Sequence, residues 1–328
     1  MVEPAYQDIA RIPELMGRYP AFRGGSVEPE DGGWANRLLY TEDADRRLVV
    51  KVPRDTGGYT YAKAAAQYEA QMVSEANDGP CPPLEIPKLI DCRGGSWLDP
   101  SYAVYSYVEG KALTSVEIQN FSDPELFAFG QKVGEFIFWL SGTIPLITCQ
   151  NIIADIRPKV HRREDMLIEQ KGWWEEVIAK GYPTVARLGA TVMGQYLKRK
   201  KTDQLRPNLT GHNDLRPGNI LFEEYDEQQR ARGIIDFGNT QPSTPENEMR
   251  HLELIGDEAV EGAVTAYEKL ANRPIDRSLL RFHGLMQLSV MATYQAKYGD
   301  NALHDIRQTR GWLERLCPNE DWSELEAA

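Results

Sequence analysis

The sequence has only four cysteines, and they form no pairs along the chain. Because they are scattered and make no C-x-x-C motif, the sequence indicates neither a zinc site nor a disulfide framework. Long apolar runs are also missing, since clusters such as Phe136–Leu140 are far shorter than the ~20 residues that span a bilayer. No charged-then-apolar signal opens the sequence. We therefore expect a cytoplasmic protein in a reducing environment, without membrane contact.

Basic charge is in short supply. The 37 Lys and Arg residues face 49 Asp and Glu residues, which gives a formal net charge of −12. Broad binding of nucleic acid or anionic membranes needs a basic surface, so neither is expected. The balance slightly favours a cationic ligand. With 328 residues, 41% of them hydrophobic, the chain is long enough for a large core and for two lobes.

No internal repeat is visible, and the first third of the chain is rich in predicted strands. Runs at 34–42 and 46–53, with a polar turn between them, predict a hairpin. Residues 59–76 follow, with an apolar stripe at helical spacing and Glu69 at its margin. Ser101–Gly110 predicts another strand that ends in a glycine turn. We place the boundary between the two lobes near that turn.

Helical patterns dominate the rest of the chain, apart from one interruption. A wide apolar stripe covers 126–140, and the pattern of 156–201 is charged and helical. Two short strands are then predicted at 219–224 and 231–237, joined by the polar turn YDEQQR. Helical patterns return after them and continue toward the end of the sequence.

The segment GHNDLRPGNILF at 211–222, followed by GIIDFG at 233–238, carries the clearest chemical signal. Either half alone is typical of a turn. Together they form a His-x-Asp-x-x-x-x-Asn loop that leads into a strand, with an Asp-Phe-Gly on the next strand, as in kinase-like catalytic sites. Asn219 and Asp236 offer the hard oxygen ligands that Mg²⁺ prefers. Asp214 would accept the proton of a substrate hydroxyl, which predicts phosphoryl transfer.

On these motifs the chain resembles the aminoglycoside phosphotransferase and choline-kinase-like family of small-molecule kinases. Within it the sequence looks most like the aminoglycoside 2″-phosphotransferases and the macrolide phosphotransferases. The supporting segments are, in the order that the family has them, GGWANRLLY, LVVKVPRD, YEAQMVSEANDGPCPPLEIPKLI and YSYVEGKALT. The resemblance covers most of the chain.

The resemblance implies an α+β, two-lobed protein-kinase-like fold with a nucleotide in the cleft. Residues 1–105 would form a small β-rich N-terminal lobe, 106–110 a hinge, and 111–328 a larger, mainly helical catalytic and acceptor-binding lobe. Lys51 would reach the α- and β-phosphates, held by an ion pair with Glu69; Glu75 is the less favoured partner.

Further positions follow from the same resemblance. The hinge backbone from Ser106 to Val108 would receive the purine edge of ATP or GTP. Gly32 and Gly33 occupy the place of the flexible loop that covers the phosphates, although the full G-x-G-x-x-G pattern is missing. His212 would brace the catalytic loop through hydrogen bonds rather than take part in the chemistry.

Two departures from the family pattern lie near the catalytic loop. Asn213 stands where most members have glycine, although the 2″ branch is similar there. Glu248 stands where an aspartate usually steadies the loop, and its side chain is one methylene longer. Whether it can replace that aspartate is left open by the sequence.

The expected activity is transfer of a γ-phosphoryl group to a hydroxyl of a small, cationic acceptor. We favour an aminoglycoside, with a macrolide as the second antibiotic class. Acids that could line the acceptor site include Glu253, Asp257, Glu258 and Glu261, and aromatic residues include Tyr267, Tyr294 and Tyr298. A metabolic kinase for a small alcohol, amine or sugar and a non-catalytic nucleotide-binding module are the alternatives.

Overall fold

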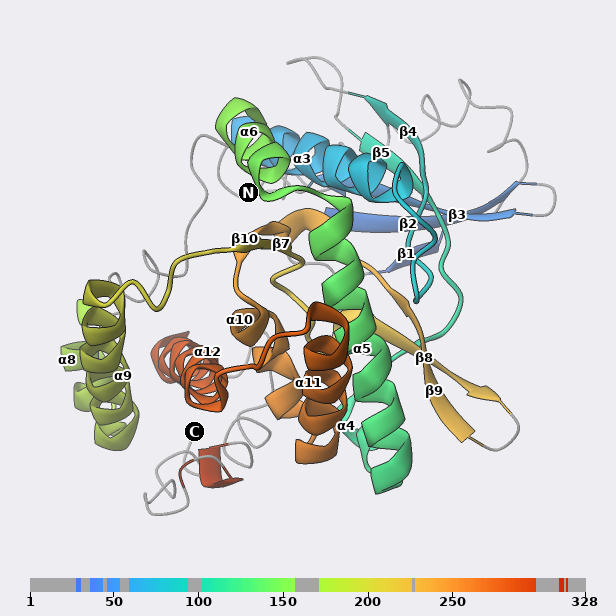
Figure 1. The fold of residues 1–328 in the computed structure, drawn as a ribbon. Coiled ribbons are helices and arrows are strands. Elements are labelled where there is room, and N and C mark those ends of the chain that lie inside the picture. Colours follow the sequence, from blue (N-terminus) through green and yellow to red (C-terminus); the bar gives the residue numbers. More distant parts are fainter. Residues whose placement is uncertain are drawn as a thin grey trace.

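A five-stranded antiparallel sheet forms the first part of the described fold (Figure 1). The computed structural model describes residues 28–30, 36–43, 46–53, 59–93, 102–156, 171–225, 228–298, 313–315 and 317. The sheet has the strand order β1-β2-β3-β5-β4. Its strands are β1 (Glu28–Glu30), β2 (Asn36–Asp43), β3 (Arg46–Pro53), β4 (Leu89–Arg93) and β5 (Tyr102–Ser106).

Helix α3 (Tyr59–Asn77) follows β3 and packs against this sheet. Tyr68, Met72 and Ala76 recur at helical spacing and are all buried, which explains why this stretch is a helix with one face inward. The helix ends at Asn77, directly before the Asp-Gly-Pro turn that breaks the pattern.

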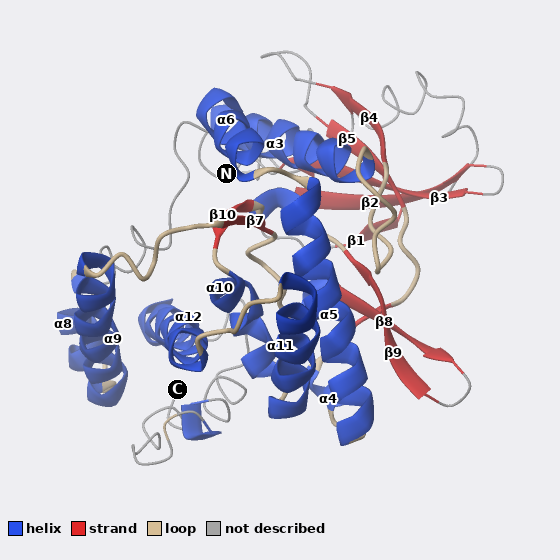
Figure 2. Ribbon diagram, in the orientation of Figure 1, coloured by secondary structure: helices blue, strands red, loops and turns tan. Residues whose placement is uncertain are grey.

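The chain leaves the sheet after β5 and becomes mainly helical (Figure 2). Two small antiparallel sheets lie among the helices, one of order β6-β8-β9 and one that pairs β10 with β7. Their strands are β6 (Lys111–Ala112), β7 (Leu209–Gly211), β8 (Ile220–Tyr225), β9 (Gln228–Ile234) and β10 (Gln241–Ser243). The helices are α4 (Ser115–Ile118), α5 (Asp123–Thr143), α6 (Leu146–Ile156), α8 (Trp174–Ala179), α9 (Pro183–Lys201), α10 (Pro245–Met249), α11 (Asp257–Ala271) and α12 (Arg277–Tyr298).

One apolar cluster runs through both parts of the fold. It joins Tyr68 of α3 and Tyr105 of β5 to Phe136 of α5 and to Phe237, which follows β9. Phe136 and Phe237 meet edge to face, with ring centroids 6.3 Å apart. Helix α3 therefore packs on the helical part of the protein as well as on the sheet, which fixes the position of the residues it carries.

The backbones of α5 and α11 approach each other unusually closely, and the two helices lie side by side in Figure 1. The reason is glycine at the contact. A Cβ atom on Gly130 or Gly134 of α5 would overlap the backbone of α11, and one on Gly262 of α11 would overlap the backbone of α5. The absence of side chains at these positions lets α11 lie along α5.

The structure confirms the main elements expected from the sequence among the described residues, with two corrections. The strand expected over Ser101–Gly110 is shorter, because β5 ends at Ser106. Residues 157–170 of the expected helical stretch lie outside the described residues. The hairpin is present as β2 and β3, which pair over their full length. The strand expected at 231–237 is wrong at both ends, because β9 begins at Gln228 and ends at Ile234. Asp236 has a left-handed backbone with φ of +68°, which is incompatible with a strand ladder. It therefore lies just beyond the strand.

Among the described helices, none is by itself long and apolar enough to cross a membrane. The pair α5 and α6, bent by 72° at its break, meets the criterion only by length and composition. The apolar residues of α5 are largely buried inside the protein.

The glycine contact between α5 and α11 predicts opposite effects for two substitutions on one helix. We expect Gly134→Ala to lower the free energy of unfolding by about 1–3 kcal/mol, because the added methyl group overlaps the α11 backbone. The matched control is Gly142→Ala, where no atom lies within 4 Å of the added methyl group. That change should raise the free energy of unfolding by about 0.5–1 kcal/mol through helix propensity. Urea unfolding of both variants checks this, and equal effects would contradict the packing argument.

Candidate active site

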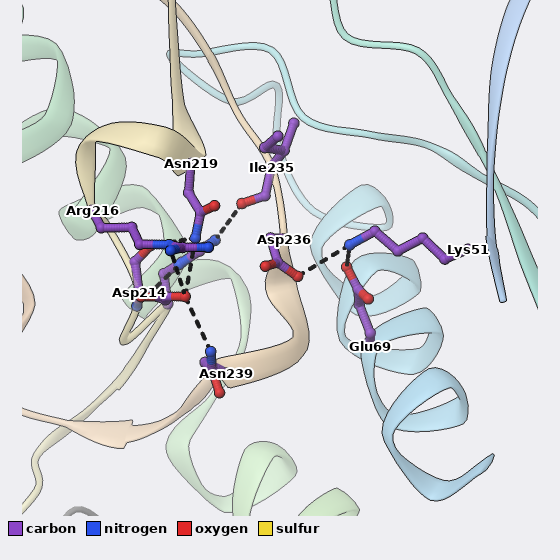
Figure 3. A network of polar contacts seen from close by, with 9 residues as sticks. Lys51, Glu69, Asp214, Arg216, Asn219, Ile235, Asp236 and Asn239 are labelled. Carbon is purple, nitrogen blue, oxygen red and sulfur yellow. Dashed lines mark hydrogen bonds and ion pairs between the residues drawn. The ribbon is translucent and has the colours of Figure 1, made fainter. Parts of the chain in front are cut away.

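Lys51, Glu69 and Asp236 form a compact charged cluster between the sheet, α3 and the segment after β9 (Figure 3). The Lys51 Nζ atom donates to Glu69 Oε1 at 2.6 Å and to Asp236 Oδ1 at 3.1 Å. The pair of Lys51 with Glu69 is the one that the sequence predicts, and Glu75 plays no part in it. Three separate stretches of the chain thus meet at one ammonium group.

Burial governs the electrostatics of this cluster. Burial alone would lower the pKa of the Lys51 ammonium, but Asp236 and Glu69 outweigh it and raise that pKa above its usual value. The Lys51 charge is in turn the main cause that lowers the pKa of Asp236. Burial raises the pKa of the Glu69 carboxyl, and Lys51 opposes this rise. Lys51 and Asp236 are therefore held as a charged pair.

The backbone explains why these side chains meet. Lys51 is opposite Ala103 in the ladder between β3 and β5, so it lies in the interior of the sheet rather than at an edge. Glu69 is 3% exposed, because α3 packs on the sheet and on the helical part at once. The sequence placed Glu69 only at the margin of the buried face.

Asp214 lies in the loop after β7, and its contacts all involve one side of its carboxylate. Oδ2 accepts from Asn219 Nδ2 at 3.0 Å and from Asn239 Nδ2 at 3.1 Å. Arg216 Nε lies 3.7 Å from the same oxygen (Figure 3). Among the described residues, no hydrogen bond reaches Oδ1. The carboxylate is thus held by Oδ2, which leaves Oδ1 for a ligand.

His212 is fully buried and connects the loop to the segment that follows β9. Its Nδ1 accepts a hydrogen bond from the Asp214 N–H at 3.3 Å, so the ring proton is on Nε2, which lies 3.1 Å from the Ile235 carbonyl. Burial lowers the pKa of the ring, although Asp214 and Asp236 oppose this, and the neutral form is favoured. These are the contacts that a bracing role needs, and that role stays a prediction.

Asn213 has a left-handed backbone with φ of +63°, which most residues avoid. Its side chain donates to the carbonyls of Gly211 at 3.1 Å and Gln241 at 3.0 Å, and accepts from Asn247 at 2.9 Å. Asparagine tolerates this conformation better than most residues. It therefore supplies a left-handed backbone of the kind that glycine adopts readily, and adds hydrogen bonds that glycine lacks.

Glu248 takes the loop-bracing position that the sequence left open. Its Oε2 accepts from the Asn213 N–H at 2.9 Å, and its Oε1 accepts from the Ser243 hydroxyl at 2.7 Å. A Cβ atom on Gly211 would overlap this carboxylate, so glycine is needed there. The Glu248 side chain thus reaches the loop because Gly211, which lies against its carboxylate, has no side chain.

Asn219 and Asp236 are adjacent in space through their backbones. The Ile235 N–H donates to the Asn219 carbonyl at 3.0 Å, which places Asp236 one residue from this contact. Because the Asn219 amide nitrogen donates to Asp214, its oxygen is the atom left for a ligand. No cluster of three or more His, Cys, Asp or Glu suited to a metal occurs among the described residues. The oxygens of one amide and one carboxylate nonetheless fit Mg²⁺, which keeps several of its waters.

The expected hinge follows the end of β5. The Ser106 N–H donates to the Lys88 carbonyl and the Tyr107 N–H to the Arg47 carbonyl, each at 2.9 Å. In the described part of the chain, the Val108 N–H makes no such backbone bond. The Tyr105 ring is buried, with its centroid 5.8 Å from Lys51 Nζ.

Other predicted positions are less informative. Gly32 and Gly33 lie outside the described residues. Of the candidates for the acceptor site, Glu261 pairs with Arg277 on the surface, and Tyr267 fills the core against Phe138.

Sequence reasoning missed several residues that shape the site. Arg216 and Asn239 contact Asp214, and Arg250 donates to the backbone carbonyls of Asn213 and Asn247. Arg216 and Asn239 are next to the recognised motifs, so proximity in sequence was an available signal. Arg250 is fully buried but lies on a polar helical stretch, where no pattern distinguishes it from an exposed arginine.

Fold and site together define a phosphotransferase of the kinase-like class. A mixed α+β chain carries a buried Lys–Glu pair beside an Asp-Phe-Gly segment, and a His-Asn-Asp loop faces that segment. The model of the phosphotransferase enzyme family matches residues 26–274, and the chain belongs to this family.

Solved structures of similar fold cover nearly all of the chain. Wild-type aminoglycoside 2′-phosphotransferase-IIIa in its GDP complex has 15% identity and a TM-score of 0.66, over 97% of this chain and 98% of that one. ADP-bound aminoglycoside phosphotransferase APH(2″)-Ib has 17% identity and a TM-score of 0.61, over 94% and 97%. Macrolide 2′-phosphotransferase MphH from Brachybacterium faecium has 17% identity and a TM-score of 0.54, over 96% and 99%.

At these identities the likeness shows the fold alone. Among curated protein sequences, none matches this chain significantly.

Substitutions at Asn213 should separate its backbone role from its side-chain role. We expect Asn213→Gly to lower the free energy of unfolding by about 1–3 kcal/mol, because buried hydrogen bonds are lost while the backbone is kept. Asn213→Ala should cost about 1–2 kcal/mol more, because alanine is strained at this φ. Urea unfolding measures both. A glycine variant as stable as the wild type would show that the side-chain bonds do not hold the loop.

The lowered pKa of His212 predicts a pH effect of definite sign. The ring stays neutral in the folded protein, whereas it takes up a proton near pH ~6.5 once unfolded. Its contribution to stability is therefore complete above pH ~6.5 and is lost as the pH falls from there toward the folded-state pKa.

Long-range ¹H–¹⁵N NMR spectra should show the Nε2–H tautomer, with protonation only below pH ~6.5. The resonance is assigned by its loss in His212→Gln. Titration at or above the ordinary value would contradict the buried, hydrogen-bonded ring.

Proposed function

We propose that this protein is a small-molecule kinase that transfers the γ-phosphoryl group of a nucleoside triphosphate to a hydroxyl of an antibiotic. An aminoglycoside is the favoured acceptor, and a macrolide is the second class. One observation carries this proposal. The Asp214 carboxylate is held through Oδ2, which leaves Oδ1 for a substrate hydroxyl, and Asn219 of the same loop contacts the segment that bears Asp236. A candidate proton acceptor, Asp214, thus lies next to the residues that would bind the metal and the phosphates.

The nucleotide site would be built from Lys51 and the hinge. Glu69 and Asp236 fix the position of the Lys51 ammonium through two ion pairs. From that position Lys51 would contact the α- and β-phosphates. The backbone from Ser106 to Val108 would receive the purine edge, with Val108 N–H as a donor. Both ATP and GTP suit backbone recognition of this kind, although the bulk of Tyr105 at the inner side could bias the choice.

Asn219 and Asp236 would hold Mg²⁺ through their side-chain oxygens, and the lowered pKa of Asp236 keeps its carboxylate charged. When bound, the ion would neutralise charge on the β- and γ-phosphates. Gly32 and Gly33 would cover the phosphates.

Asp214 would act as the catalytic base. The acceptor hydroxyl donates to Oδ1, its oxygen attacks the γ-phosphorus, and the bond to the β–γ bridging oxygen breaks. The nucleoside diphosphate leaves with that electron pair, and the hydroxyl proton passes to Asp214. Asn239 and Asn219 would keep the carboxylate oriented through Oδ2, and His212 would steady the loop by accepting a hydrogen bond from the Asp214 N–H.

The acceptor class rests on the motifs and on charge. The catalytic loop resembles that of the 2″-phosphotransferases, and a net charge of −12 suits a polycationic ligand. A structure of similar fold is described as a complex with GDP and kanamycin, and another as a macrolide 2′-phosphotransferase. The four cysteines are free thiols, which suits the reducing cytoplasm in which we place the reaction.

A substrate panel tests the proposed function. Purified protein is assayed with ATP and with GTP against aminoglycosides, macrolides and simple metabolic alcohols, amines and sugars, in the presence of Mg²⁺. We expect turnover that depends on an aminoglycoside. In Asp214→Ala it should fall by at least about 10²-fold, the lower range for a positioned base, while nucleotide binding by calorimetry is nearly unchanged.

The other outcomes are equally definite. Turnover with a metabolite alone would establish the alternative, a metabolic kinase of the same fold. Nucleotide binding without acceptor-dependent turnover on any compound would favour a non-catalytic binding module. Wild-type turnover in Asp214→Ala would show that the catalytic assignment is wrong.

A further inference from the structure

Arg216 is a cation beside the candidate base that no step of the proposed chemistry uses. It lies two residues after Asp214, where the following Pro217 opens a tight turn closed by the Asn219 N–H and the Arg216 carbonyl at 2.9 Å. The backbone of Arg216 is therefore fixed by the same turn that positions Asn219. Its side chain is 35% exposed and lies next to Asp214 in Figure 3.

The guanidinium is not consumed by contacts within the protein. Its Nε atom is buried and makes no hydrogen bond with any described residue. The 3.7 Å from Nε to Asp214 Oδ2 is too long for a hydrogen bond, and that oxygen already accepts from Asn219 and Asn239. A buried donor without a partner is costly, so a ligand oxygen would be a favourable partner for it.

A γ-phosphoryl group must approach Asp214 closely, since the attacking hydroxyl is bound to that carboxylate. Two negative groups would repel each other there, and the Lys51 ammonium, held by Glu69 and Asp236, is assigned to the α- and β-phosphates. Arginine offers a planar fork of donors that matches phosphate oxygens. It is the described cation nearest to Asp214 by its printed contacts.

From this geometry we propose that Arg216 is a catalytic residue that binds the γ-phosphoryl group of the donor nucleotide through its guanidinium. It would hold that group in line with the acceptor hydroxyl on Asp214 and offset the charge of the carboxylate. The inference rests on the proposed function, because it presupposes a nucleoside triphosphate in the site.

Comparison of a triphosphate with a diphosphate isolates the contact. Calorimetry with Mg²⁺ measures the dissociation constants of ADP and of its β,γ-imido triphosphate analogue, or of the guanine pair if GTP is preferred. In Arg216→Met we expect affinity for the triphosphate analogue to fall about 10- to 100-fold, the size of a charge-assisted hydrogen bond, with diphosphate affinity within about twofold. Arg216→Lys should restore part of the loss, because it keeps the charge without the fork.

Arg230→Met is the matched control, since Arg230 is an exposed arginine of β9 that pairs with Glu223 outside the site. It should leave both affinities unchanged. Thermal unfolding of the three variants verifies that each is folded, as expected for Arg216, whose buried Nε atom makes no hydrogen bond to a described residue.

Two results would overturn the inference while leaving the proposed function intact. If Arg216→Met weakened diphosphate and triphosphate binding equally, the residue would serve the site in general rather than the γ-phosphoryl group. If neither affinity changed and turnover were normal, the guanidinium would not contact the nucleotide. Failure of the wild type to bind any nucleotide would instead refute the proposed function, and this inference with it.

Discussion

The position of the Lys51 ammonium between two carboxylates is the constraint on which the rest of the site depends. A charge removed from water is costly unless partners replace the lost hydration. Glu69 and Asp236 supply that replacement, one from α3 and one from the segment after β9. Removing either partner would leave the buried ammonium with a single carboxylate. The ion pairs of Lys51 Nζ thereby hold the sheet, α3 and the segment after β9 in their relative positions.

A second polar network holds the opposite wall of the site. Glu248 and Arg250 come from the short helical stretch after β10, and both are buried against the loop that carries Asp214. They bind the N–H and the carbonyl of Asn213, so the left-handed residue is fixed at both backbone groups. The strained backbone conformation of Asn213 is tolerated because the surrounding hydrogen bonds hold the residue in it. The loop that carries Asp214 is thus held by several buried hydrogen bonds, and Oδ1 of Asp214 accepts none from a described residue.

The division of chemistry between these walls suits a family that phosphorylates diverse small molecules. Phosphoryl transfer needs positioning and charge rather than covalent chemistry, and both walls supply these with a few side chains. This explains why the fold and the family follow from the chain while the acceptor stays a proposal at about 16% identity to the solved structures.

The sequence by itself determined which segment carries the kinase-like motif, because motif spacing is a local property that is readable without coordinates. Through those motifs its resemblance to the family also implied the class of fold and the Lys51–Glu69 pair, which the structure contains. Only the tertiary structure decided the rest. It ended β9 before Asp236, buried Glu69 fully, and brought Asn239, Arg216 and Arg250 to the catalytic loop. Such contacts join residues by packing of distant segments, and side-chain identity alone does not encode which polar groups will be buried together.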